Sequence, residues 1–152
     1  MNHDAWMQKC VEMAVQNVED GMPPFAAVVV KDGEEIASAV NDGPEQQDPT
    51  AHGEIRALQK AGKELGSTDL SGCVLYTNCE PCPMCLGAVY WSGIKDVYYG
   101  LSIEGQAEFD DLPKQMYEEY QKEKGKRSVR VRGIIPHDAD PRAPFVKQEE
   151  KT

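Results

Sequence analysis

Two short stretches of the sequence combine residues that could bind a metal ion. Residues 50–54 read Thr-Ala-His-Gly-Glu, and residues 79–85 read Cys-Glu-Pro-Cys-Pro-Met-Cys. Zinc prefers imidazole nitrogen and thiolate sulfur, and a catalytic zinc site keeps three protein ligands so that water can take the fourth position. We therefore predict that His52, Cys82 and Cys85 bind Zn²⁺.

Glu54 supplies a carboxylate two residues after His52, near enough to reach a water at the metal without being a ligand. Zinc lowers the pKa of a bound water towards about 7, and a nearby carboxylate can take its proton and pass it on. The pattern His-x-Glu with Pro-Cys-x-x-Cys is the signature of zinc-dependent nucleobase deaminases. We predict a hydrolytic exchange of a ring amine for oxygen, with Glu54 as the catalytic proton carrier.

Three other metal or redox sites fit parts of the pattern. A closed structural zinc site would add Cys79 as a fourth ligand and would leave Glu54 without a role. An iron–sulfur cluster would use the three clustered cysteines, but the usual fourth cysteine is missing. A redox pair of thiols would not need the histidine and glutamate. We rank all three behind the catalytic zinc site.

Composition narrows the cellular setting and the partners. The 152 residues fit one domain, so we expect residues 1–152 to form a single deaminase domain, with a tail from about 136 to 152. The net charge of -10 disfavours nucleic acid, although residues 122–132 are locally basic. The absence of a signal sequence or a long apolar run, with five cysteines in an unpaired pattern, predicts a cytoplasmic protein that does not enter membranes.

Hydrophobic periodicity predicts alternating helices and strands. Helices are expected over 4–20, 48–66, 81–92 and 112–124, and strands over 25–30, 35–40, 73–77, 95–99 and 128–134. Asp32-Gly33 predicts a hairpin turn, and Asp48-Pro49 predicts a helix start with Asp48 as N-cap. Each half of the predicted zinc site thus lies near a helix N-terminus, in a layered α/β domain.

The sequence resembles the cytidine/deoxycytidylate deaminase superfamily, and most closely its guanine deaminase branch. The resemblance runs from about Met1 to Asp111. It rests on the opening Met-Asn-His, Pro24-Phe25 before the Val28–Gly33 hairpin, Asn41, Asp48–His52, Leu75–Thr77, Cys79–Ala88 and Phe109–Asp111.

The resemblance implies a three-layer α/β/α fold around a five-stranded mixed sheet, and a homodimer. It assigns the zinc ligands to His52, Cys82 and Cys85, and the proton shuttle to Glu54. It places Phe25, Asn41 and Asp111 in contact with the substrate base, and it gives no role to Cys79 or Asp110.

The implied reaction is conversion of guanine and water into xanthine and ammonia. Cytosine, another aminopyrimidine, an aminotriazine or a nucleoside is an alternative substrate for the same chemistry. A tRNA adenosine deaminase would be an RNA-modifying alternative, and a zinc-stabilised scaffold would be a non-enzymatic one.

The chain departs from the guanine deaminase branch in ways that bear on the substrate. Gly53 stands where the branch usually has alanine, and Ala26 stands where it usually has glycine. The stretch between Tyr99 and Phe109 is short, and the tail ends without an aromatic residue after Phe145. In the branch this tail closes the pocket, often from the partner subunit.

Overall fold

A four-stranded mixed sheet in the order β2-β1-β3-β4 forms the centre of the structure. The computed structural model describes residues 2–152 as two units, one ending at Glu118 and one spanning Glu119–Thr152. The strands are β1 (Ala26–Lys31), β2 (Glu34–Val40), β3 (Cys73–Cys79) and β4 (Asp96–Leu101). The first unit's helices are α1 (His3–Glu19), α2 (Gly43–Gln46), α3 (Gly53–Leu65), α4 (Pro83–Ser92), α5 (Ile103–Gln106) and the start of α6 (Leu112–Gln121).

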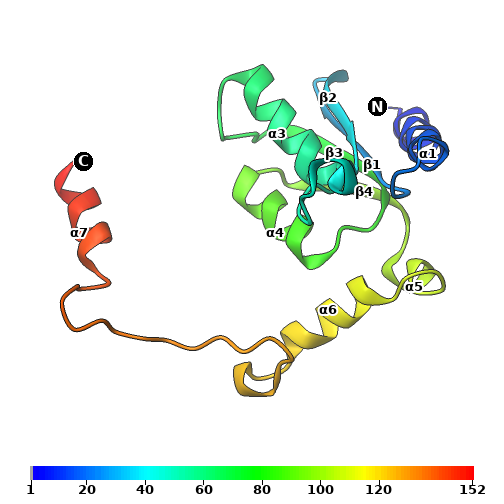
Figure 1. The fold of residues 1–152 in the computed structure, drawn as a ribbon. Coiled ribbons are helices and arrows are strands. Elements are labelled where there is room, and N and C mark those ends of the chain that lie inside the picture. Colours follow the sequence, from blue (N-terminus) through cyan, green and yellow to red (C-terminus); the bar gives the residue numbers. More distant parts are fainter. Residues whose placement is uncertain (1) are drawn as a thin grey trace. The chain divides into compact units, whose positions relative to one another are not determined.

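Helices cover both faces of this sheet, as Figure 1 shows: α1 lies on one face, and α3 and α4 lie on the other. The sequence of β1 explains why helices cover both faces of the sheet, because successive side chains of a strand point to opposite faces. Val28 and Val30 pack with α1, whereas Ala27 and Val29 pack with α3 and α4. All four side chains are fully buried, so β1 is the apolar centre of the fold.

Strand directions bring the two metal-binding stretches to one end of the sheet. β1 runs antiparallel to β2 and β3, and β3 runs parallel to β4. The predicted hairpin is confirmed, with Asp32 and Gly33 both at positive φ between β1 and β2. α4 follows the carboxyl end of β3, so Cys82 and Cys85 lie at that edge.

The expected five-stranded sheet is wrong, because residues 128–134 form no regular secondary structure. Valine and arginine alternate there as in a half-buried strand, yet Val129 and Val131 are exposed. Alternating apolar and polar residues indicate only that one face of an extended segment is apolar. A strand also needs a neighbouring strand whose backbone N–H and C=O groups pair with its own.

Two helix starts lie further along the chain than expected. α3 begins at Gly53 with His52 as its N-cap, and α4 begins at Pro83 with Cys82 as its N-cap. Asp48 instead closes a local turn by accepting hydrogen bonds from the backbone N–H and hydroxyl of Thr50. Both shifts put a metal-binding side chain at the residue that caps a helix.

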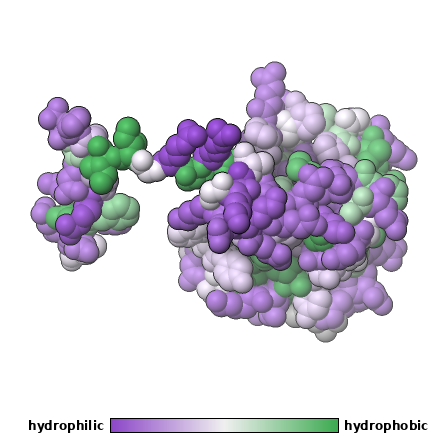
Figure 2. All heavy atoms as spheres, turned by 90° about the horizontal axis from the view of Figure 1, so that it is seen from below, coloured by the Kyte–Doolittle hydropathy of each residue, from purple (hydrophilic) through white to green (hydrophobic). Residues whose placement is uncertain are grey.

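The second unit, Glu119–Thr152, has little regular structure of its own. It contains the end of α6, a 3₁₀ turn η1 (Lys124–Lys126) and helix α7 (Ala143–Glu150), which the sequence did not predict. Its residues are almost all exposed, and apolar surface is visible among the polar residues of the molecule in Figure 2. Within residues 2–152, no helix is both long and apolar enough to span a membrane.

Candidate active site

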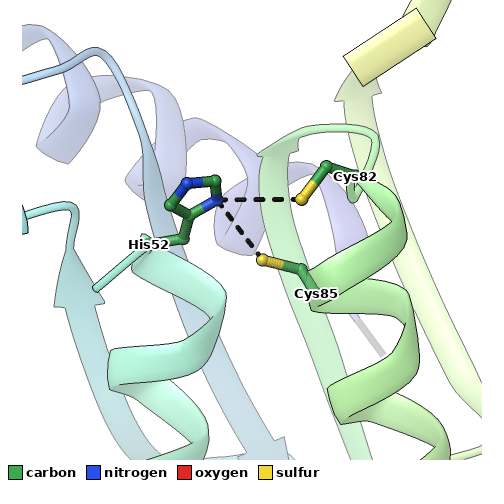
Figure 3. Close-up of side chains that lie close together, drawn as sticks. All are labelled: His52, Cys82 and Cys85. Atoms are coloured by element: carbon green, nitrogen blue, oxygen red, sulfur yellow. Dashed lines mark hydrogen bonds between the residues drawn. The ribbon is translucent and has the colours of Figure 1, made fainter. Parts of the chain in front are cut away.

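His52, Cys82 and Cys85 converge between the starts of α3 and α4 (Figure 3). Nδ1 of His52 lies 3.8 Å from Sγ of Cys82 and 3.5 Å from Sγ of Cys85. Their ligand atoms all lie within 4.8 Å of one another. Cys82 caps α4 and Cys85 lies in its first turn, so this three-residue spacing brings both thiols to one side of the helix.

The separations fit a tetrahedral zinc ion. Zn–S and Zn–N bonds of about 2.3 and 2.0 Å at tetrahedral angles put a sulfur and a nitrogen about 3.5 Å apart. The two observed N–S distances, 3.5 and 3.8 Å, are close to that value. Two sulfurs and one imidazole nitrogen are a soft donor set that suits zinc, and they leave a fourth position for a small ligand.

Helix ends and hydrogen bonds favour a thiolate at Cys82. The N-terminus of α4 carries a positive partial charge beside this sulfur. Hydrogen bonding from Cys85, assisted by His52, lowers the pKa of Cys82 to about 4. The same contact raises the pKa of Cys85, and the hydrogen bond to Cys82 raises the pKa of His52. The surroundings of Cys82 therefore favour its thiolate form, which is the form that binds zinc.

Glu54 is a buried carboxyl group beside the three ligands. It lies in the first turn of α3 and is 5% exposed. Burial raises the pKa of Glu54, although hydrogen bonding to its own backbone opposes this effect. A carboxyl group with a raised pKa exchanges protons more readily near neutral pH than an exposed one, which suits a proton carrier.

A small cavity of about 30 Å³ lies over these groups. That volume has room for about one water molecule. Its walls are Phe25, His52, Glu54, Cys79, Glu80, Cys82, Gln106 and Pro113. The Phe25 ring is nearly parallel to the His52 ring, with an interplanar angle of 8° and centroids 6.4 Å apart. The cavity is therefore polar at the metal-binding end and has an aromatic wall.

Asn41 lies in a second cavity, of about 350 Å³, that shares His52 with the first. Its Oδ1 accepts a hydrogen bond from the Gly43 N–H at 2.9 Å, which directs the oxygen towards the protein. The adjacent Asp42 pairs with Arg56 of α3 at 3.2 Å and ties this loop to the helix that begins after His52. The carboxamide of Asn41 is thereby held in this loop through its oxygen.

The structure does not place Asp111 in the walls of either cavity. Asp111 is exposed and directly precedes α6, where its carbonyl accepts from the Gln115 N–H. Asp110 accepts from the Leu112 N–H at the same helix start. Cys79 is buried in the wall of the small cavity, but it is not part of the group of three ligands in the described chain.

Sequence reasoning missed several residues around the small cavity. Gln106 and Pro113 line it from α5 and α6, and Glu80 lines it from the loop before α4. Tyr117 of α6 donates a hydrogen bond at 2.6 Å to the carbonyl of Pro81, next to Cys82. Their positions depend on how α5 and α6 return to the sheet, so the local sequence carried no signal for them.

Comparison with known proteins agrees with this geometry. The model of the cytidine and deoxycytidylate deaminase zinc-binding region matches residues 1–101. The chain belongs to this deaminase family. A guanine deaminase of Bacillus subtilis is 48% identical over 114 residues, covering 73% of each chain. A tRNA-specific adenosine deaminase of the same organism is 39% identical over 97 residues, covering 64% of this chain and 60% of the relative.

Solved structures show the same relationship. The crystal structure of the Bacillus subtilis guanine deaminase matches with a TM-score of 0.91 at 38% identity, over 99% of this chain and 95% of the other. A protein solved in complex with 8-azaguanine matches with a TM-score of 0.69 at 32% identity, over 71% of this chain and 63% of the other. Family and site together identify the protein as a zinc-dependent aminohydrolase.

Proposed function

We propose that this protein deaminates guanine, consuming one water and releasing xanthine and ammonia. The observation that carries the proposal is a buried carboxyl group, Glu54, in the same small cavity as the zinc-binding His52 and Cys82. The similarity to a guanine deaminase over most of the chain favours guanine as the base. An 8-azaguanine complex of a further relative supports a free purine as the substrate class.

His52, Cys82 and Cys85 would hold the zinc, whose Lewis acidity makes a water nucleophilic near neutral pH. Glu54 accepts a proton from that water on a carboxylate oxygen. It then delivers a proton to the departing exocyclic nitrogen, so that the C–N bond breaks with release of ammonia. The C–O bond formed to the same ring carbon becomes the new carbonyl of the product.

Three further residues would orient the base. The Phe25 ring offers a flat apolar surface parallel to His52, on which an aromatic base can stack. Asn41 would donate from Nδ2 to a ring acceptor, since its oxygen is already paired with Gly43. We assign Asp111 to the guanine edge on family resemblance, and its place just before α6 puts it two residues from Pro113 in the cavity wall.

Ammonia release from a panel of bases tests the proposal. Guanine, cytosine, adenine, an aminotriazine and a tRNA anticodon arm would be compared with zinc-loaded wild type. Guanine should be turned over most efficiently, and the net charge of -10 argues against the RNA. Preference for another base or for the RNA would reject guanine as the substrate.

Replacing Glu54 with glutamine tests the mechanism separately from the substrate. We expect kcat to fall by about 10²–10⁴ with zinc content unchanged, because the amide cannot carry the proton. Glu64→Gln, at an exposed position on α3, is the matched control and should retain full activity. Undiminished kcat in Glu54→Gln would show that this carboxyl group does not move the protons.

We also propose that the active form is a homodimer in which residues 136–152 contact the partner subunit. Within Glu119–Thr152, Ile134 and Ile135 are 88% and 81% exposed, and Phe145 of α7 is 69% exposed. A segment of this size cannot build its own core, so another copy would cover these side chains. On this proposal residues 1–152 remain a single deaminase domain, completed by exchange of the tail.

The face formed by α3 and α4 would be the main contact between the subunits. Trp91 and Tyr90 of α4 are 91% and 79% exposed, beside an apolar hollow of about 820 Å³ lined by both helices. Large exposed aromatic side chains next to an apolar hollow favour association. Light scattering should give twice the chain mass for wild type, and Trp91→Lys should give a monomer.

Mixing two inactive variants tests whether the tail acts across the dimer. Phe145→Asp disrupts the tail and Glu54→Ala disrupts the site. After subunit exchange, a tail acting on the partner should restore about a quarter of wild-type activity, because half of the dimers then contain one complete site. No restoration in mixed dimers would place the tail on its own subunit.

The five free cysteines are compatible with a reducing, cytoplasmic location for this dimer.

A further inference from the structure

Gln106 is a polar side chain inside the small cavity that the reaction described above does not use. It is the last residue of α5 and is 6% exposed. It shares the cavity with Glu54 and Cys82. No hydrogen bond to its carboxamide is found among residues 2–152, and the carboxamide is not one of the fully buried unpaired groups, so its polar atoms remain accessible to a ligand in the cavity. A polar side chain in this position indicates that its hydrogen-bond partner is a group of the bound ligand.

The backbone holds Gln106 in a fixed position. Its N–H donates to the Ser102 carbonyl at 2.8 Å, and its own carbonyl accepts from Phe109 and Asp110 at 2.9 Å each. The Ser102 side chain caps the turn by accepting from the Gly105 N–H at 3.0 Å. A side chain on such an anchored turn is preorganised for recognition.

The same turn is tied to the loop that carries Cys82. Glu80 accepts a hydrogen bond from the Ile103 N–H at 3.1 Å, at the start of α5. In the other direction, the Glu80 N–H donates to the Leu101 carbonyl at 2.8 Å. The distance between Gln106 and the metal ligands is thereby fixed through two hydrogen bonds rather than through a flexible loop.

The size of the cavity selects which part of a substrate meets Gln106. About 30 Å³ is much too small for a whole base, so a base would reach Glu54 and Gln106 with one edge and the substituent group on that edge. Glu54 and Gln106 would both face that group, and they differ in chemistry. Glu54 can exchange a proton, whereas a carboxamide cannot ionise and offers one acceptor oxygen and two donor hydrogens.

We propose that Gln106 is a specificity-determining residue whose Oε1 accepts a hydrogen bond from the exocyclic amine of the substrate base. This inference rests on the proposed deaminase function and names the group that recognises the leaving amine. A base that carries hydrogen at the reacting carbon would leave the carboxamide unpaired, and the site would bind it less well. After the reaction, Nε2 can donate to the new carbonyl of the product, so the same side chain can bind the substrate through its amine and the product through its carbonyl.

The test compares ligands that differ by the amine alone. Binding of 8-azaguanine and of 8-azahypoxanthine to the zinc-loaded protein would be measured by calorimetry with Gln106 intact and with Gln106→Leu, both in the Glu54→Gln background so that the amine is not removed during the titration. We expect 8-azaguanine to bind about tenfold more weakly to the variant, the loss of one hydrogen bond, with 8-azahypoxanthine unchanged. A purely structural role would weaken both ligands equally, and an unchanged ratio would overturn the proposal.

Two further variants keep the result interpretable. Gln115→Leu makes the same change at an exposed position on α6 and should leave both affinities as in wild type. If Gln106→Leu does not fold, Gln106→Glu serves instead. It retains an acceptor for the amine but has no donor for a carbonyl, so binding of xanthine should fall about tenfold while that of 8-azaguanine persists. Equal binding of xanthine by this variant and wild type would reject the proposal.

Failure of the proposed substrate would be seen separately. If wild type released ammonia from another base and not from guanine, guanine deamination would be wrong. The comparison would then use that base and its analogue with hydrogen in place of the amine. Loss of amine discrimination in Gln106→Leu would still support the role of Gln106, and retained discrimination would still refute it.

Discussion

Replacing Gly53 with alanine should push the start of α3 away from β1. A Cβ atom at this position would lie 3.1 Å from Cα of Ala26 and 3.3 Å from its N and C atoms. Ala26 cannot yield easily, because its N–H donates to Asn78 at 2.8 Å and the residue pairs with Val40 in the sheet. His52 caps the same helix and would move with it.

The expected loss of stability is the difference of two effects. Overpacking a well-packed interior costs about 1–3 kcal/mol. Alanine in place of glycine at a helical position gains about 0.4–1 kcal/mol through the unfolded state. We expect Gly53→Ala to lower the free energy of unfolding by about 1 kcal/mol, which lowers the midpoint of thermal unfolding by about 2–4 °C for a chain of this size. Zinc affinity should fall as well, because His52 is displaced.

A double-mutant cycle makes this contact testable. Urea unfolding at fixed zinc concentration would be measured for Gly53→Ala, for Ala26→Gly and for the double variant, which is the combination usual in the guanine deaminase branch. The added methyl group would meet the backbone of residue 26, and glycine there removes the buried methyl group that helps to hold this backbone in place, so the double variant should be about 1 kcal/mol more stable than the sum of the single changes predicts.

Gly87→Ala in α4 is the matched control. Its added Cβ would meet no atom within 4 Å, so this variant should gain about 0.4–1 kcal/mol. If Gly53→Ala proves as stabilising as Gly87→Ala, or if the two changes in the cycle are additive, the close approach of α3 to β1 does not position His52.

Three other outcomes follow from the structure. Cys85→Ser should retain much less zinc than wild type after dialysis, and chelation should lower the unfolding temperature of wild type more than that of the variant, because zinc stabilises only the folded site. Burial raises the pKa of Cys10 to about 12 and of Cys79 to about 11, so both thiols should resist iodoacetamide at pH 8. Because both pKa values lie above the ordinary value of 9.0, protonation of these thiols favours the folded state, and stability should decline as pH rises from about 9 to about 12. Rapid labelling of both thiols in the native protein at pH 8 would contradict the raised pKa values. Tyr117→Phe removes the hydrogen bond to Pro81 and should cost about 0.5–1.5 kcal/mol in urea unfolding, whereas unchanged stability would mean that the bond contributes nothing.

The prediction of zinc chemistry from sequence succeeded because the donor atoms belong to short local patterns. The spacing of Cys82 and Cys85 brings two thiols to one side of any helix that begins between them. His52 and Glu54 are equally local, and their residue types restrict the metal and the reaction. The positions of β1 to β4 along the chain and the hairpin at Asp32-Gly33 could also be predicted, since apolar runs and turn residues indicate local preference.

Local preference did not locate the boundaries that matter for the site. The sequence predicted Asp48 as a helix N-cap, but its carboxylate accepts a hydrogen bond from Thr50, and α3 begins only after His52. The alternation at residues 128–134 predicted a fifth strand that the sheet does not contain. Both errors arise because capping and pairing depend on which partner groups are near in space, and a periodic pattern does not identify those partners.

The sequence by itself therefore determined which chemistry this protein can perform, because the identity and local spacing of His52, Glu54, Cys82 and Cys85 restrict the metal and the proton carrier. Only the tertiary structure decided that Nδ1 of His52 faces both sulfurs, and that Gln106 reaches the same small cavity from α5. The physical reason is that these groups lie far apart along the chain. They meet through the packing of α3 and α4 on the sheet and through the hydrogen bonds of Glu80 to the turn around α5.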